Sequence, residues 1–211
     1  MNTQANANNM SYAQLIRASI GTSVVVLGLF GALYCTAAVG IGQLAFPAQS
    51  NGSLIEQQGV VIGSSLVAQP FSGQQYFHPR PSAASYNPMS MAGSNQALSN
   101  PDMQKRVTEA STQVATQNGI DAAHIPSDLI TQSGSGMDPD ISPAAAALQI
   151  KRVAAQRGVS DAQIQQLLQQ HTTTRQFAVL GEPRVNVLQL NLALDKLYPA
   201  ITPAPVVQGV I

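Results

Sequence analysis

Residues 18–41 read Ala-Ser-Ile-Gly-Thr-Ser-Val-Val-Val-Leu-Gly-Leu-Phe-Gly-Ala-Leu-Tyr-Cys-Thr-Ala-Ala-Val-Gly-Ile, and they decide the architecture of this chain. The run lies between Arg17 and the next charged residue, Glu56. A helix needs about 20 such residues to cross a hydrocarbon core of about 30 Å, so this stretch can cross with some tilt. We therefore predict a short N-terminus over residues 1–17, one membrane-spanning helix over residues 18–44 and one outer domain over residues 47–211.

Two other readings of the apolar run are weaker. A cleaved signal peptide has an apolar region of only about 7–15 residues, and this one is much longer. A lipoprotein would be modified at Cys35, but Tyr34 stands where a small residue is expected. Cys35 is then a thiol buried in the membrane, and we expect the span to be retained.

The basic residues on either side of the span indicate its orientation. Arg17 precedes the span, whereas the far side has no Lys or Arg until Arg80. Since short cytoplasmic flanks are enriched in basic residues, we expect the N-terminus in the cytoplasm. The outer domain is then periplasmic, on a chain anchored by a single pass in the inner membrane of a Gram-negative cell.

The charge composition limits the possible partners. The chain has 10 Lys and Arg, 10 Asp and Glu, and only 9% charged residues. Without a basic stripe, nucleic acid is excluded as an expected partner. Such a low charge density has two explanations: a surface covered by other subunits, or the uncharged polar surface of some secreted proteins.

Small residues recur at helical spacing within the span. Gly28 and Ala32 are four positions apart, as are Ala38 and Gly42. Such pairs let a second helix approach closely in the membrane, although small residues are common in any span. Gly28 and Ala32 are therefore candidate contacts to a partner helix, and membrane lipid is a further expected partner of the span.

The outer domain is predicted to mix short strands with helices. Proline after an N-cap residue, a capping box and terminal glycines mark helices over residues 101–118, 143–157 and 160–171. Residues 187–197 are compatible with a strand, but Asn186 and Pro199 favour a helix. A strand or hairpin is expected at Val60–Ile62 and Ser65–Val67. The fold class is thus α+β: one N-terminal transmembrane helix followed by a single mixed α/β extracytoplasmic domain.

A proline- and glycine-rich stretch over residues 71–100 is either disordered or an ordered functional loop. Aromatic residues favour order, because they can anchor such a loop to a core; they are Phe71, Tyr76, Phe77 and Tyr86.

Enzyme signatures are largely missing from the sequence. There is no phosphate-binding Gly-x-x-x-x-Gly-Lys-Ser/Thr loop and no Asp-Lys-Thr-Gly-Thr phosphorylation motif. A metal site would have to combine a histidine with Asp138 or Asp140, and a serine hydrolase would need Ser133 or Ser135 outside a nucleophile elbow. We prefer a tight loop at residues 133–136, whose glycines permit close backbone approach, and an Asx-turn at Asp138. Arg80, held between two prolines, is expected either to meet a partner's carboxylate or to pair with Asp128 or Glu182.

Several motifs occur together in a fixed order and resemble the KdpC family, the C subunits of Kdp-type potassium-transporting ATPases of bacteria and archaea. Two positions depart from the pattern: Asp140 stands where the family often has His, and Met91-Ala92 where it often has Ser-Gly. The motifs are Tyr76-Phe-His-Pro-Arg-Pro-Ser-Ala83, Gly93-Ser-Asn95, Ile125-Pro-Ser-Asp-Leu129, Ser133-Gly-Ser-Gly-Met-Asp-Pro139, Ile141-Ser142 and Gly181-Glu-Pro-Arg-Val-Asn-Val-Leu188.

The resemblance implies a four-subunit complex. Its other members are a channel-like potassium-binding subunit, a P-type ATPase subunit and a small single-span subunit. Potassium, and ATP with magnesium, are handled by those partners, and no cofactor is expected on this chain. The C subunit is implied to be non-catalytic, to stabilise the complex and to promote ATP binding by the pump subunit as a catalytic chaperone. The candidate residues for partner contact or loop ordering are Gly28, Ala32, Arg80, Ser82, Ser94, Asn95, Asp128, Ser133, Ser135, Asp138, Arg184 and Asn186.

The expected orientation places the outer domain opposite the cytoplasmic ATP, so its effect on ATP binding would be an indirect coupling. Two alternatives remain: a stand-alone, membrane-anchored periplasmic solute-binding protein, and, less favoured, a membrane-anchored hydrolase.

Overall fold

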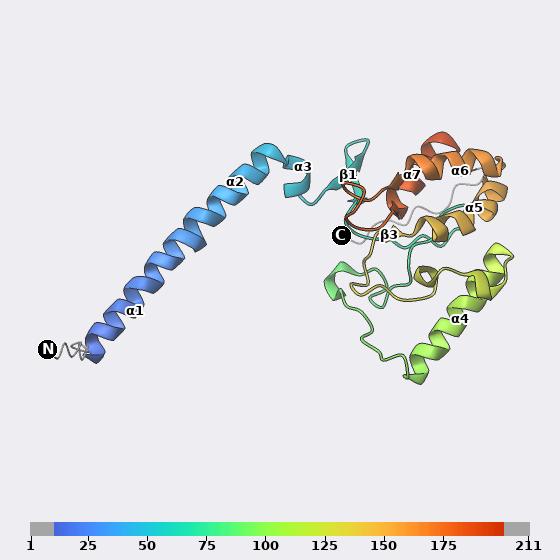
Figure 1. The fold of residues 1–211 in the computed structure, drawn as a ribbon. Helices are drawn as coiled ribbons and strands as arrows, with labels where there is room; N and C mark the ends of the chain where they lie inside the picture. The colour runs from blue at the N-terminus through green and yellow to red at the C-terminus, as the bar shows by residue number, and fades with distance from the viewer. Residues whose placement is uncertain (1–10, 201–211) are drawn as a thin grey trace. The chain divides into compact units, whose positions relative to one another are not determined.

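The computed structural model describes residues 11–200. The chain divides into two units, the first ending at Ser53 and the second beginning at Leu54. The first unit is one continuous helical segment, Tyr12–Ala45, formed by α1 (Tyr12–Val26), a π-helical stretch (Leu27–Tyr34) and α2 (Cys35–Ala45). It reaches a mean hydropathy of 2.2, so it is long and apolar enough to cross a membrane. The helix begins at Tyr12, before the predicted membrane segment of residues 18–44, because Ser11 and Gln14 form a capping box, and the bounds of the membrane segment stay a prediction. A short α3 (Pro47–Ser50) follows it (Figure 1).

The second unit starts with a two-stranded hairpin of β1 (Leu54–Gln57) and β2 (Val60–Ser64). The run Val60–Ile62 lies in β2 as predicted, but its partner strand is β1, which precedes it, and not Ser65–Val67. Ser65–Val67 is not a strand; the chain turns there instead.

Three helices begin and end where their capping residues predict. They are α4 (Pro101–Asn118), α5 (Pro143–Arg157) and α6 (Asp161–Gln170). Gly119 and Gly158 end the first two in the left-handed region, with φ of 64° and 66°, where a side chain would be strained. The apolar positions of α4 at Val107, Ala110 and Val114 are only half-buried, and no residue of this helix is fully buried.

Residues 187–197 form a helix, α7 (Val187–Leu197), as the Asn186 cap predicts. It follows directly on β5 (Arg184–Asn186), the central strand of a small antiparallel sheet. β3 (Asp140–Ile141) and β4 (Thr172–Thr173) flank it, in the order β3-β5-β4. Short 3₁₀ turns occupy Pro88–Ser90, Ala122–His124 and Ser127–Leu129.

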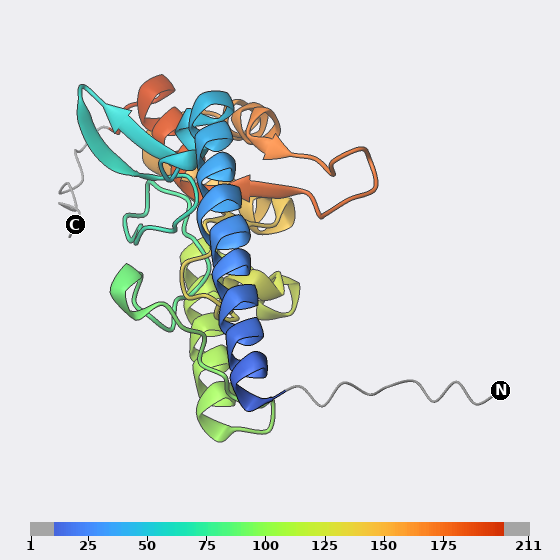
Figure 2. The same ribbon diagram turned by 90° about the vertical axis from the view of Figure 1, so that its left-hand side faces the viewer.

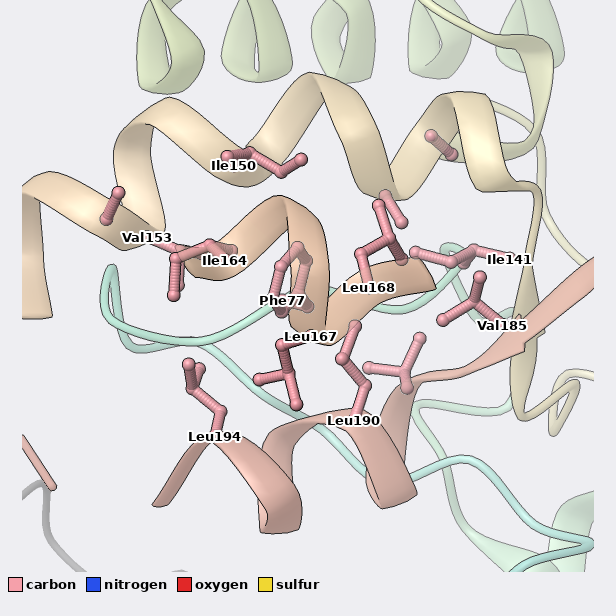
Figure 3. Close-up of a cluster of buried hydrophobic side chains, with 14 of the residues drawn as sticks. Phe77, Ile141, Ile150, Val153, Ile164, Leu167, Leu168, Val185, Leu190 and Leu194 are labelled. Carbon is pink, nitrogen blue, oxygen red and sulfur yellow. The ribbon is translucent and has the colours of Figure 1, made fainter. Parts of the chain in front are cut away.

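The core of the second unit forms where α5, α6 and α7 meet the sheet. Figure 3 shows Phe77, which comes from the long loop, among side chains from all three helices. Its ring is completely buried, so the loop over residues 71–100 is anchored as its aromatic residues predict. The remaining core residues drawn there include Ile141, Ile150, Val153, Ile164, Leu167, Leu168, Val185, Leu190 and Leu194.

Candidate functional site

The long loop is fixed to the helices by two buried amide side chains. Asn191 accepts a hydrogen bond from the Phe77 amide and donates one to the Phe77 carbonyl, each at 2.9 Å. Gln149 does the same for His78, accepting from its N–H at 2.8 Å and donating to its carbonyl at 3.2 Å. A primary amide offers both a donor and an acceptor. Each side chain therefore pairs with the backbone N–H and C=O of one loop residue, as a neighbouring strand would in a sheet.

Two arginines of α5 hold the segment just before Phe77. Arg152, only 8% exposed, donates to the carbonyls of Gln74 and Tyr76, and to Asn118 and Gln149. Burial lowers its pKa to about 10, so the guanidinium remains charged near neutral pH.

Arg157 is the second of these arginines. It donates to the carbonyls of Gln75 and Tyr198 at 3.0 Å and 2.8 Å, and lies 4.9 Å from the centre of the Tyr76 ring. Its contact with Asp195 at 2.8 Å is a charge pair without hydrogen-bond alignment. The Tyr76 hydroxyl donates to the same carboxylate, and burial, then Asp195, raises the pKa of Tyr76.

The predicted loop residues gather where residues 80–95 meet residues 133–138. The Ser82 hydroxyl donates to the Gly136 carbonyl at 2.6 Å and accepts from the amides of Ala84 and Tyr86. Ser133 is 3% exposed, and its amide donates to the Pro81 carbonyl at 3.2 Å. Ser82 and Ser133 therefore tie the two loops together.

Glycines allow these loops to touch through their backbones. A Cβ on Gly93 would lie 2.7 Å from the Gly134 carbonyl oxygen, and one on Gly136 would lie 2.8 Å from that of Ala92. Gly136 also has a φ of 72°, which other residues adopt rarely. The close approach expected from the glycines of this loop is thus present at Gly136, whereas at Gly134 the glycine that permits the approach is Gly93, because a Cβ on Gly134 would meet nothing within 4 Å.

Arg80 forms an internal ion pair, but its partner is Asp138, at 3.0 Å, rather than Asp128 or Glu182. Asp128 instead accepts from the amide and hydroxyl of Ser142 at the start of α5. Glu182 pairs with Arg175. The path of residues 80–95, which the sequence does not reveal, brings Arg80 to the Asp138 carboxylate.

Asp138 and Asp140 are both engaged. Asp138 accepts from the Asp140 amide at 3.1 Å, the Asx-turn predicted from the sequence. Asp140 pairs with Arg184 at 3.1 Å. Burial raises the pKa of Asp140, and the Arg184 charge opposes that shift.

The remaining candidates do not bridge the two loops through any hydrogen bond found in the described residues. Ser135 accepts from the Met137 amide, and Asn186 donates to the Ser65 carbonyl while capping α7. Ser94 and Asn95 are exposed, and Asn95 has a φ of 51°. Gly28 and Ala32 are exposed in the first unit, on the π-helical stretch.

The described residues give no support to the metal or hydrolase readings. Within residues 11–200, no cluster of three or more His, Cys, Asp and Glu side chains is placed to hold a metal ion. The hydrogen bonds of His78 and His124 in the same range do not involve Ser133 or Ser135.

Sequence reasoning missed Gln149, Arg152, Asn191 and Arg157 as the residues that hold the long loop. The sequence did contain a signal, because Asn191 lies on the apolar face of α7, four positions after Val187 and three before Leu194. A polar residue on such a face is buried and must find a partner.

Within residues 11–200, one helix able to span a membrane is joined to a mixed domain whose polar residues tie loops together, which is the architecture of a membrane-anchored subunit with one folded domain. The chain belongs to the KdpC family, whose model, described as the c chain of the K+-transporting ATPase, matches residues 16–196.

Several relatives match the sequence of this chain over most of their own length. A potassium-transporting ATPase KdpC subunit of Xanthomonas campestris pv. campestris is 50% identical over 181 residues, covering 86% of this chain and 87% of the relative. The subunit of Gemmatimonas aurantiaca is 48% identical, covering 87% and 94%. That of Beijerinckia indica is 42% identical, covering 90% and 98%. This chain is accordingly a KdpC subunit of a potassium-transporting ATPase complex.

Proposed function

We propose that this chain is a non-catalytic subunit that stabilises a high-affinity potassium uptake complex and raises the ATP affinity of its pump subunit. It assembles with a channel-like potassium-binding subunit, a P-type ATPase subunit and a small single-span subunit. Those partners handle potassium, and ATP with magnesium. The proposal follows from the family, since relatives of this chain are named as subunits of a potassium-transporting ATPase.

The structural observation that carries the proposal is that polar side chains among the candidate residues bond to other groups of the same domain. Arg80, Ser82 and Asp138 direct their hydrogen bonds and charges into the domain. Buried Arg152 and Asn191 are likewise used to fix a loop. Such an arrangement supports a rigid surface for subunit contact.

The proposed arrangement places residues 1–17 in the cytoplasm, residues 18–44 across the inner membrane and residues 47–211 in the periplasm. Its support is the basic asymmetry between Arg17 and Arg80. The outer domain then acts on the ATP site through the membrane subunits. Couplings of this kind are typically about 1–3 kcal/mol, or about 5–150-fold in affinity.

Assembly of the complex tests the proposal. The chain truncated after Ser53, the end of the first unit, is compared with the full chain by co-purification of tagged complex from membranes. We expect the truncation to lower recovery of complete complex or, where complex forms, to lower its apparent ATP affinity. Full recovery with unchanged ATP affinity would contradict the proposal and favour a stand-alone solute-binding protein.

A further inference from the structure

The connection between β4 and β5 is a hairpin that projects from the body of the second unit (Figure 2). Every residue from Thr173 to Arg184 is exposed. The two strands pair only at Thr172–Thr173 and Arg184–Val185. Further out, Gln176 and Leu180 form an isolated bridge, and Arg175 meets both Glu182 carboxylate oxygens, at 2.9 Å and 2.7 Å.

The tip of this hairpin is apolar. Phe177 is 87% exposed, Val179 73% and Leu180 57%. Together, side chains of this size present on the order of 400 Å² to solvent. This area is comparable to the largest apolar patch of a typical monomer, and such patches are often functional.

The backbone of the tip is unfavourable for these residues. Phe177 and Ala178 have φ of 51° and 63°, a geometry that hairpin turns usually fill with Asn and Gly. An L-residue other than Asn or Asp is strained in the left-handed region. A turn chosen only to join two strands would avoid both this strain and an exposed phenylalanine, so the tip has another use.

We propose that the Phe177–Leu180 tip, hereafter the hairpin tip, inserts into an uncharged apolar groove on another protein subunit in the same membrane. The proposal rests on the proposed function, because it requires the chain to work within a complex. It makes the hairpin tip an anchor of the outer domain and Phe177 the residue that contributes most to that contact.

The charges favour a protein groove over a lipid surface. Arg175 is neutralised by Glu182, and Arg184 by Asp140, so the base of the hairpin has no net charge. Segments that insert into anionic lipid surfaces carry uncompensated Lys and Arg beside their apolar residues. The hairpin lacks that feature and instead matches an uncharged site.

The area favours a partner held nearby over a second, freely diffusing copy. A stable interface between free proteins buries about 800 Å² on each side, roughly twice what the hairpin tip offers. Subunits already joined in one complex meet at a high effective concentration, so a smaller contact suffices between them, whereas a second copy outside the complex lacks this advantage.

A photoreactive benzoylphenylalanine at position 177 tests the contact in the purified four-subunit complex. We expect a light-dependent adduct with another subunit, located by mass spectrometry, at a yield at least tenfold above that of the same probe at position 98. Leu98 is the matched control because it is an 80% exposed apolar residue of the same unit. Adducts only with lipid, adducts only with a second copy, or equal yields at both positions would overturn the proposal.

Phe177→Asp provides an independent readout. Aspartate tolerates the left-handed region better than phenylalanine, so this variant retains the fold. We expect at least tenfold weaker retention of the other subunits, whereas Leu98→Asp behaves as the wild type. If F177D retains them normally while truncation after Ser53 still impairs the complex, the hairpin-tip proposal fails and the proposed function stands.

Discussion

Asn191 and Phe77, separated by 114 positions, are joined by two hydrogen bonds between the side-chain amide of one and the backbone of the other. Asn191 is fully buried, as is the ring of Phe77. The pair connects the long loop to α7 and places Phe77 in the centre of the core (Figure 3). The Asn191 amide is therefore one of the groups that order residues 71–100, together with Gln149 and Arg152.

Replacing Asn191 by leucine tests this dependence. The variant leaves the buried amide and carbonyl of Phe77 without partners, and each such group costs about 1–3 kcal/mol. We expect the free energy of unfolding of the outer domain to fall by about 2–5 kcal/mol, measured by urea denaturation of the full chain in detergent. Gln189→Leu, on the exposed side of α7, is the control and should change it by less than about 0.5 kcal/mol.

Gly93 and Gly134 form a matched pair of substitutions. A Cβ on Gly93 would lie 2.7 Å from the Gly134 carbonyl oxygen, whereas one on Gly134 would meet nothing within 4 Å. We expect Gly93→Ala to destabilise the outer domain by about 1–3 kcal/mol through overpacking, and Gly134→Ala to be neutral or slightly stabilising. Thermal unfolding of the two variants gives the comparison, and equal effects would mean that the loops are not in contact.

His78 should make stability depend on pH. Burial, then the Arg152 charge, lowers the pKa of His78 from 6.5 to about 4. Between those values the unfolded chain binds more protons than the folded one, so stability is full above pH 6.5 and is lost as the pH falls towards 4. The loss attributable to this group is on the order of 3 kcal/mol.

The measurement is the urea midpoint of wild type and His78→Gln between pH 4 and 7. The variant should lose much of the acid-side slope, while His124→Gln, at an exposed position, should keep it. Parallel curves for wild type and His78→Gln would rule out a buried neutral histidine.

Gly28 tests the small-residue contact in the membrane. A Cβ there meets nothing within 4 Å in this chain, and the same holds for Gly40, so leucine at either position leaves the helix intact. We expect Gly28→Leu to reduce co-purification of the other subunits by blocking close helix approach. Gly40→Leu, the same change elsewhere on the helix, should not, and equal retention for both would exclude Gly28 as a contact.

Local features of the fold were predictable because neighbouring residues specify them. Asn100, Ser142 and Ser160 mark helix starts, and Gly119 and Gly158 mark helix ends, since capping needs only residues within one turn. The long apolar run likewise requires no tertiary information. Residues of different family motifs lie in contact, such as Ser82 and Gly136, although the spacing of the motifs does not predict these contacts.

Long-range partners were not predictable from the sequence. Arg80 selects Asp138 over Asp128 and Glu182 because of the path taken by two loops. Arg152 donates hydrogen bonds to backbone carbonyls, and no sequence pattern predicts which carbonyls an arginine will meet. The hairpin tip was missed because Phe177-Ala178 lacks the usual turn residues.

The most direct test measures the apparent KM for ATP in the assembled complex before and after removal of the outer domain. A protease site replacing residues 51–53 allows the domain to be cut off after assembly, so that assembly and coupling are separated. The account predicts that KM rises about 5–150-fold once the domain has been removed, with a smaller change in kcat. An unchanged KM after complete removal would contradict it.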